Sequence, residues 1–188
     1  MCYENNSKPE YKKQKIVTLD DFKEPDAGIP IISFFSGAGG LDLGFEAVGF
    51  KHTLLVEKIP LFCETLKLNR PEWDVYNGDV SKNEEMINEI SKYIGFDEFE
   101  GVFVGGPPCQ SFSIAANQRY SKSGENFKRV GFAHETNGNL LFDYIALIKK
   151  FRPKVFLIEN VPGLMEIDDG EQLAVAYADL EAVGYKMN

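Results

Sequence analysis

Val102-Phe103-Val104-Gly105-Gly106-Pro107-Pro108-Cys109-Gln110-Ser111-Phe112-Ser113 is the stretch around which the chain is organised. Its apolar start predicts a short buried strand, and the two glycines and two prolines end that strand abruptly. A free cysteine is usually a small buried residue, and Cys63, inside an apolar helical stretch, fits that description. Cys109 follows two prolines at the mouth of a turn. Its position therefore predicts a nucleophile.

Composition limits the classes of protein that the chain can represent. Its 188 residues suffice for one domain with a substantial core. No apolar run approaches the length of a membrane span, and the N-terminus lacks the apolar segment of a signal peptide. The three cysteines are far apart and match no zinc motif, so we expect free thiols in a reducing compartment and no metal site. A net charge of −9 argues against a surface rich in phosphate contacts.

Strand and helix patterns alternate from Pro30 onward. Residues 1–29 are polar and predict a solvated tail, whereas 30–188 predict one domain. Helical stripes separate short apolar runs, which predicts an α/β fold with a parallel sheet and helices on both faces. Ser81 and Glu84 have the spacing of a capping box and predict a helix that begins at Ser81. The expected strands are 31–35, 53–56, 75–76, 101–104 and 155–158.

The turn Ser36-Gly37-Ala38-Gly39-Gly40 follows the first of these strands and leads into a helix. Backbone N–H groups at such a turn attract anionic groups, although a tight connection would look the same. Glu57, twenty residues after Gly37, ends the second strand, where an acidic residue can accept hydrogen bonds from ribose hydroxyls. Asp79 could accept one from an adenine amino group. These residues favour a nucleoside-bearing ligand, but Asp42 replaces the third glycine of the NAD fingerprint.

Glu159 and Asn160 follow the apolar strand 155–158. If this strand pairs with strand 101–104, Glu159 can face the group that Cys109 attacks. It could then donate a proton or a hydrogen bond. The alternative is a solvated or helix-capping carboxylate.

Three motifs, Phe35–Gly40, Gly106–Ser113 and Glu159–Val161, resemble those of the DNA cytosine-5 methyltransferases in order and in strand context. The resemblance runs from about Ile31 to the C-terminus. It implies a Rossmann-like fold that binds S-adenosylmethionine and releases S-adenosylhomocysteine. The implied cofactor residues are Phe35, Gly37, Gly39, Gly40, Glu57, Lys58, Asp79, Val80, Pro107 and Leu140.

The resemblance also implies a reaction on a cytosine flipped out of double-stranded DNA. Cys109 would attack C6, and Glu159 would bind N3 and the exocyclic amine while C5 takes the methyl group. Loss of the C5 proton would then expel Cys109. The implied substrate-binding residues are Pro108, Gln110, Ser111, Asn160 and Arg119.

Family members continue with a Gln-Arg-Arg-type motif, a target recognition domain and a final motif that packs back on the catalytic domain. This sequence lacks them, so we expect an incomplete domain, truncated before its last strands, that needs a C-terminal half or second subunit. The missing part would carry most DNA contacts, which accounts for the acidic charge. Alone, the chain should bind cofactor weakly and methylate poorly or not at all. We expect a cytoplasmic enzyme of a bacterial or phage restriction-modification system.

Three other functions remain compatible with these residues. A tRNA cytosine-5 methyltransferase would use the same active-site side chains, although Ser111-Phe112-Ser113 looks more like the DNA enzymes. A non-catalytic cofactor-binding subunit of a split enzyme would keep the glycine turn and Glu57. An NAD-dependent oxidoreductase is disfavoured by Asp42 and by the proline-framed cysteine.

Overall fold

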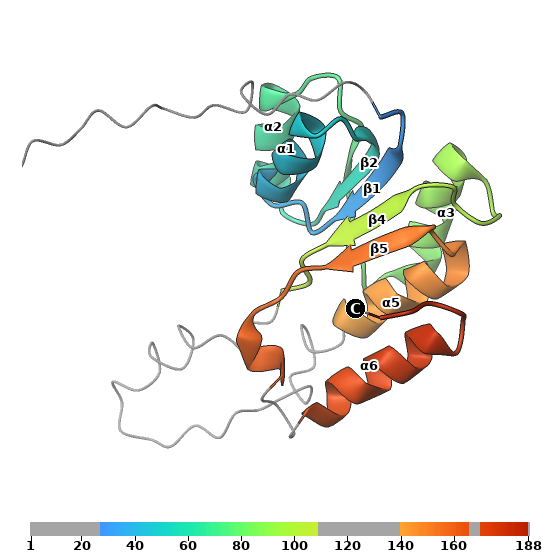
Figure 1. Cartoon of the computed structure of the whole chain (residues 1–188). Coiled ribbons are helices and arrows are strands. Elements are labelled where there is room, and N and C mark those ends of the chain that lie inside the picture. The colour runs from blue at the N-terminus through green and yellow to red at the C-terminus, as the bar shows by residue number, and fades with distance from the viewer. Residues whose placement is uncertain (1–26, 109–139, 166–169, 188) are drawn as a thin grey trace, which may run out of the picture.

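The structure is a computed structural model that describes residues 27–108, 140–165 and 170–187 (Figure 1). The tail expected at 1–29 lies almost wholly outside this range. The described elements alternate along the chain as the sequence predicts. They are β1 (Pro30–Phe34), α1 (Gly40–Ala47), β2 (Lys51–Glu57), α2 (Pro60–Asn69), β3 (Val75–Asn77), α3 (Asn83–Ile94), β4 (Val102–Gly105), α5 (Leu140–Phe151), β5 (Val155–Ile158), the 3₁₀ helix η3 (Pro162–Met165) and α6 (Glu171–Glu181).

The five described strands form one parallel sheet in the order β3-β2-β1-β4-β5. The α/β fold expected from the sequence is therefore confirmed. The chain first builds outward from β1 through β2 to β3 and then returns to add β4 and β5 on the other side. The order reverses between β1 and β4, and open α/β sheets bind ligands at the carboxyl ends of the strands beside such a reversal.

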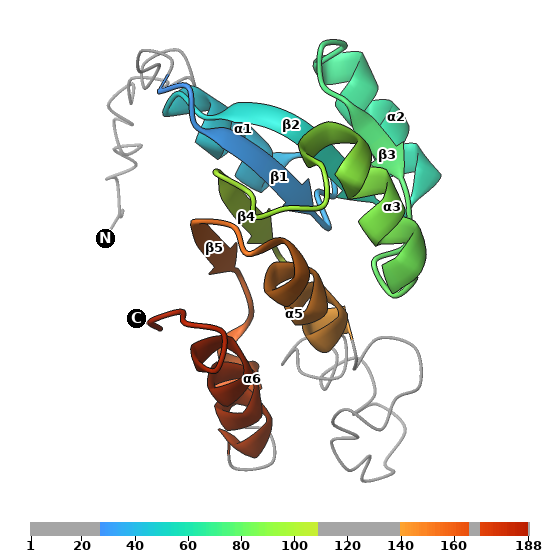
Figure 2. The ribbon, with the colours of Figure 1, turned by 90° about the vertical axis from the view of Figure 1, so that its right-hand side faces the viewer.

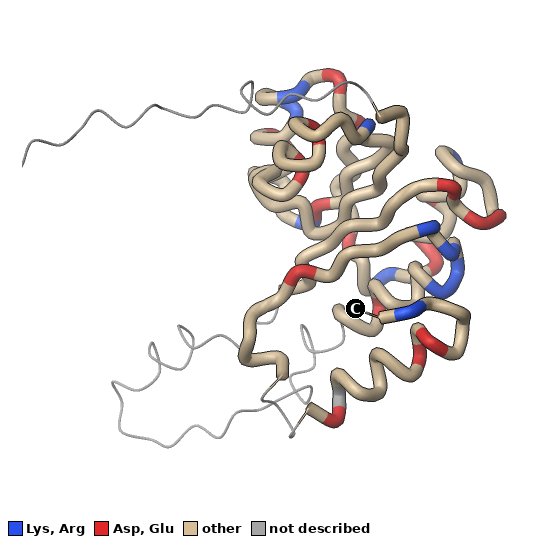
Figure 3. The backbone as a smooth tube through the Cα atoms, in the orientation of Figure 1, with Lys and Arg blue, Asp and Glu red and all other residues tan. Residues whose placement is uncertain are grey.

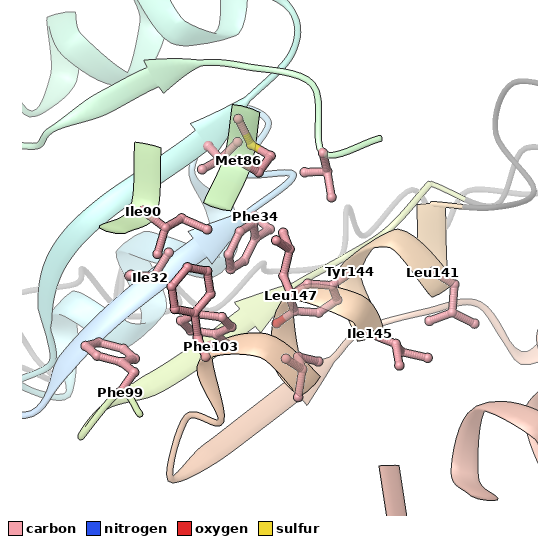
Figure 4. Close-up of a cluster of buried hydrophobic side chains, with 14 of the residues drawn as sticks. Ile32, Phe34, Met86, Ile90, Phe99, Phe103, Leu141, Tyr144, Ile145 and Leu147 are labelled. Carbon is pink, nitrogen blue, oxygen red and sulfur yellow. The ribbon is translucent and has the colours of Figure 1, made fainter. Parts of the chain in front are cut away.

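Helices cover both faces of the sheet. Figures 1 and 2 show α1 and α2 on one face and α3 and α5 on the other, with α6 packed beside α5. The larger core lies on the α3–α5 face, where Phe34 and Phe103 meet edge to face with ring centroids 5.0 Å apart (Figure 4). Tyr144 of α5 is fully buried against Phe34. This packing fixes α5 against β1 and β4, next to the point where the strand order reverses.

The opposite face carries two smaller apolar clusters. Ile31, Val102 and Val104 pack against α1, and Leu55 packs with Leu66 and Trp73. Neither cluster reaches β5. Among the described helices, none has the length and apolar character that crossing a membrane requires.

The capping box predicted at Ser81 and Glu84 is wrong. Helix α3 begins at Asn83 after Lys82, and no side chain caps it. Asp79 Oδ1 instead accepts hydrogen bonds from the Ser81 N–H (3.1 Å) and the Ser81 hydroxyl (2.8 Å). The hydroxyl that would cap the helix is therefore already bound to a carboxylate two residues earlier.

Candidate active site at the carboxyl edge of the sheet

The residues predicted to carry the chemistry meet because the strand ends are aligned. Phe34 at the end of β1 pairs with Val56 of β2 and Gly105 of β4, and Gly105 pairs with Ile158 of β5. The segments that follow these strands therefore leave the sheet along one edge. This edge brings together the glycine turn, Glu57, the start of the Pro-Pro turn and Glu159.

The glycine turn has a backbone that ordinary side chains seldom adopt. Phe35, Gly37 and Gly39 all have positive φ, at 57°, 55° and 89°. For Phe35 this is a strained conformation of the kind that gathers at functional sites. Its ring lies edge-on to Tyr144, with centroids 6.1 Å apart. Gly40 starts α1 with open space where a side chain would be, so the backbone there is accessible to a ligand.

Glu57 ties this turn to the end of β2. Its Oε2 accepts a hydrogen bond from the Gly37 N–H at 2.8 Å, and its Oε1 accepts one from the Ile59 N–H at 2.7 Å. The side chain is buried, with 6% of the residue exposed. A carboxylate offers about four acceptor positions, so two remain for a ligand after these backbone bonds are made.

The main chain of Glu57 is held by three further donors. Its carbonyl accepts hydrogen bonds from the Cys63 thiol (3.3 Å), the Asn77 side-chain amide (2.9 Å) and the Gly78 N–H (3.1 Å). Burial, and next the Glu57 carboxylate, raise the pKa of the Cys63 thiol, which keeps it protonated as a donor. The expectation that Cys63 is a buried core residue is confirmed. Sequence reasoning missed the support from Asn77, whose signal was its place at the end of β3.

Asp79 and Lys58 form an ion pair, with Nζ 2.8 Å from Oδ2. Burial acts to raise the pKa of Asp79, but hydrogen bonds from Lys58 and Ser81 outweigh it and hold the pKa below its usual value. The carboxylate is thus ionised and fixed beside the end of β2. The Val80 side chain is buried in the larger core, so a ligand could meet only the main chain of that residue.

The ends of β4 and β5 form the other half of the site. The Glu159 N–H donates to the Gly105 carbonyl at 2.9 Å, which continues the pairing one residue past the strands. A Cβ atom on Gly106 would lie 3.2 Å from Glu159 Oε2. The Asn160 side-chain amide donates to the Pro107 carbonyl at 3.4 Å. The predicted neighbourhood of the two strands is confirmed, and Glu159 lies directly beside the turn that leads to Cys109.

Several predicted site residues cannot be placed in this geometry. Cys109, Gln110, Ser111 and Arg119 lie outside the described residues. Pro107 is buried and Pro108 exposed at the last described positions before Cys109. Leu140, the first residue of α5, is buried. Within the described ranges, no group of three or more histidine, cysteine or acidic residues is arranged to hold a metal ion.

The structure is a Rossmann-like α/β domain in which the glycine turn, Glu57 and Glu159 lie along the carboxyl edge of one parallel sheet. The model of the C-5 cytosine-specific DNA methylase family matches residues 29–188. The chain belongs to this family. Members of the family generally depend on S-adenosylmethionine.

Curated relatives agree with this assignment. The chain is 35% identical over 193 residues to the type II methyltransferase M.PspPI of Psychrobacter sp. strain TA137 and 37% identical over 144 residues to M.AquIA of Picosynechococcus sp.. These alignments cover 94% and 76% of this chain but 41% and 52% of the relatives. The chain therefore spans about half the length of these relatives, or less.

Solved structures show the same fold. One described as a DNA modification methyltransferase encoded within an E. coli prophage has 29% identity and a TM-score of 0.59 over 82% of this chain and 38% of its own. DNMT2 of Spodoptera frugiperda has 18% identity and a TM-score of 0.56, covering 82% of this chain and 41% of its own. At that identity, the second likeness concerns the fold alone.

Proposed function

We propose that this chain is the catalytic portion of a DNA cytosine-5 methyltransferase of a restriction-modification system. The proposal rests on two half-sites that lie on either side of the point where the strand order reverses, between β1 and β4. One half is the glycine turn bonded to Glu57, and the other is Glu159 beside Gly106. A cofactor held at the first half-site and a base held at the second would meet beyond the carboxyl ends of β1 and β4.

S-adenosylmethionine, when bound, supplies the methyl group. The two free acceptor positions of Glu57 suit the two ribose hydroxyls, since the backbone bonds from Gly37 and Ile59 already fix the carboxylate. Asp79 is an ionised acceptor close by and suits an adenine amino group. Phe35, Gly39, Gly40, Lys58, Val80, Pro107 and Leu140 would complete the cofactor site. Gly40 and the main chain of Val80 would contribute backbone contacts.

The reaction begins with the Cys109 thiolate, which bonds to C6 of a flipped cytosine and makes C5 carbanion-like. Glu159 holds N3 and the exocyclic amine as charge develops. C5 takes the methyl group, loses its proton, and the C6–sulfur bond breaks to release Cys109. Asn160, bonded to the Pro107 carbonyl, keeps the two turns together. Pro108, Gln110, Ser111 and Arg119 would contact the cytosine and the DNA.

Cofactor binding tests the first half of this proposal. Titration calorimetry of the chain with S-adenosylhomocysteine should show binding that Glu57→Gln weakens about tenfold or more, because an amide cannot accept both backbone N–H bonds and two ribose hydroxyls. Glu100→Gln is the matched control. Glu100 pairs with Lys154 at the opposite end of the sheet, so this variant should bind as the wild type does.

Covalent trapping tests the second half. The chain joined to the C-terminal part of M.PspPI should form a gel-stable complex with DNA that contains 5-fluorocytosine. Cys109→Ala should abolish that complex, and trapping that survives the substitution would refute the role of Cys109. Competition with unmodified duplex DNA and with tRNA distinguishes the two cytosine substrates.

We further propose a polypeptide partner that completes the domain. Val155 and Leu157 of β5 pair with Val102 and Val104, so they point to the face that α1 covers, yet they are 57% and 38% exposed. A shallow hollow of about 210 Å³ on α1 lies between Leu41, Phe45 and Val48. A C-terminal half or second subunit that carries the target recognition domain would cover this apolar face.

The distribution of charge on this chain agrees with a partner that makes most of the DNA contacts. Acidic and basic residues are interspersed over the described backbone rather than collected on one basic side (Figure 3). Phosphate contacts need clustered lysine and arginine. Most of them would therefore come from the partner segment, and we propose that the assembled enzyme acts on DNA in the bacterial cytoplasm.

A further inference from the structure

One buried polar pair has no part in the proposed reaction. Asp42 of α1 is fully buried, the His52 side chain of β2 is 1% exposed, and Asp42 Oδ1 lies 3.4 Å from His52 Nε2. Neither carboxyl oxygen and neither ring nitrogen forms a hydrogen bond with any described residue. Burying such groups is costly unless they interact with each other. Apolar side chains could fill the same space under α1 without this cost. The presence of the polar pair therefore points to a role other than stability.

The pair is linked to the glycine turn through α1 and Trp73. Asp42 is the third residue of α1, whose N-cap residue is Gly39, and His52 is near the start of β2, the strand that ends in Glu57. The Trp73 ring packs against His52 at a tilt of 39°, with centroids 4.6 Å apart. Trp73 and Leu66 also occupy the space where Gly39 would carry a side chain, at 3.7 Å and 2.8 Å from that Cβ position.

Arg70 makes a second contact with Trp73 and connects it to α1. The Arg70 guanidinium lies over the Trp73 ring, 5.8 Å from its centroid, and its Nε donates to Glu46 Oε2 of α1 at 2.9 Å. Helix α1 is therefore connected to the strand and loop beneath it by Asp42 at its start and by Glu46 one turn later. The first connection is a close polar contact between two buried side chains, and the second is an ion pair between Arg70 and Glu46.

We infer that Asp42 and His52 are positioning residues that set where α1 begins and thereby hold the glycine turn in its ligand-binding conformation. Glycine residues at 37 and 39 leave the turn little stiffness of its own. Glu57 holds the turn through the Gly37 N–H, and the Asp42–His52 pair holds it through the start of α1 and through Trp73. This inference rests on the proposed function, since it concerns the turn that would bind the cofactor.

Amide hydrogen exchange of the full chain tests the inference without any cofactor. The double variant Asp42→Leu/His52→Phe keeps a branched and a ring side chain at the two positions, adds some volume and removes the polar pair, a kind of replacement that often leaves stability unchanged or raised. We expect the Gly37 and Gly39 amides to exchange about tenfold faster, because local opening of the turn becomes easier. Exchange in α5 should not change. His52→Gln keeps an N–H donor within reach of Asp42 and should restore most of the protection.

Two controls separate positioning from general stability. Leu180→Val lowers stability from the buried face of α6, far from the turn, and should leave the exchange of Gly37 and Gly39 unchanged relative to α5. Asp42→Asn keeps the shape and weakens the pair, so it should accelerate the same two amides even if the double variant does not fold. Unchanged exchange of these amides in Asp42→Asn and in the folded double variant would overturn the inference.

Cofactor affinity gives a second readout. S-adenosylhomocysteine should bind the double variant about tenfold more weakly than the wild type, and Trp73, the one tryptophan of the chain, should report binding through its emission. A wild type that binds no S-adenosylhomocysteine would refute the proposed function, while the exchange experiment would still decide the role of the pair. Equal affinities in wild type and variant would count against positioning.

Discussion

Gly39 is the residue at which the glycine turn leaves least room for a side chain. Its φ is 89°, and a Cβ atom would lie 2.8 Å from Leu66 Cδ2. We expect Gly39→Ala to lower the free energy of unfolding by about 1–3 kcal/mol, because an L residue is strained at this φ. Urea denaturation followed by circular dichroism measures the change.

Gly44→Ala is the matched control for this prediction. Gly44 lies within α1, and its Cβ position meets nothing within 4 Å. Alanine should therefore raise stability by up to about 1 kcal/mol. Equal losses in the two variants would show that α1 tolerates no alanine, for reasons unrelated to the turn.

Asp79 should make stability depend on pH. Burial opposes its ionisation, but the bonds from Lys58 and Ser81 prevail and lower its pKa. An acid with a lowered folded-state pKa stabilises the fold fully above its unfolded pKa, about 3.9, and this contribution is lost as the pH falls through the folded value. Asp79→Asn should thus cost about 1 kcal/mol at pH 7 and progressively less below pH 4.

Urea unfolding at pH 7, 5, 4 and 3 measures this dependence. Asp74→Asn serves as the control, since Asp74 is exposed and its backbone carbonyl bonds to Leu55 whichever side chain is present. Its effect should stay small at every pH. An Asp79→Asn cost that persists unchanged at pH 3 would mean that the carboxylate charge is not what stabilises this turn.

At the residue scale, prediction from the sequence was correct where a single strong feature determines the place of a side chain. Glu57 ends a strand after a glycine turn, and its backbone bond to Gly37 agrees with that placement. The Asp42–His52 pair escaped prediction because a polar residue in an amphipathic helix is expected to face solvent. Asp42 was interpreted only as a departure from the NAD fingerprint. The capping box at Ser81 was predicted wrongly because the Ser81 hydroxyl donates to Asp79, two residues earlier, and not to the helix.

At the scale of elements, α5 approaches β4 closely behind the site. A Cβ atom on Gly105 would lie 3.0 Å from Tyr144 Cε1 and 3.4 Å from Phe34 Cβ. Tyr144 is fully buried and cannot move aside without disturbing Phe34. We expect Gly105→Ala to cost about 1–3 kcal/mol of stability through overpacking.

A double-mutant cycle with Tyr144→Leu checks this cause. The smaller side chain relieves the overlap, so the double variant should be more stable than the sum of the single effects by about 1 kcal/mol. Additive effects would place the cost of Gly105→Ala elsewhere. The measurement is the urea midpoint and slope of all four proteins.

Element order and type followed from apolar periodicity, whereas element ends did not. Strand β2 begins at Lys51, two residues before the predicted start, because Lys51 and His52 pair with Pro30 and Ile31. Such pairing depends on a neighbouring strand, so the local pattern of polar and apolar residues does not reveal it. The aligned strand ends nevertheless made the position of the site predictable, since parallel strands all carry their carboxyl ends to the same edge.

At the scale of the whole molecule, the sheet face beside α1 carries apolar side chains that no described element covers. Val155 and Leu157 continue the apolar surface of Val102 and Val104, which α1 covers, beyond the edge of that helix. Contiguous exposed apolar surface of this kind marks interaction sites. We expect the isolated chain to bind the dye ANS and to self-associate at high concentration.

The double variant Val155→Thr/Leu157→Thr tests this face. Threonine suits an edge strand, so stability should change by less than about 1 kcal/mol, while ANS fluorescence should fall about twofold or more. Leu68→Thr is the control, because Leu68 is an exposed residue of α2 that belongs to none of the apolar clusters. If Leu68→Thr lowered ANS fluorescence as much, the dye would be reporting scattered surface leucines. A partner polypeptide that covers the face should suppress ANS binding in the wild type and should bind the double variant more weakly, which connects this surface to the assembly that the proposed reaction needs.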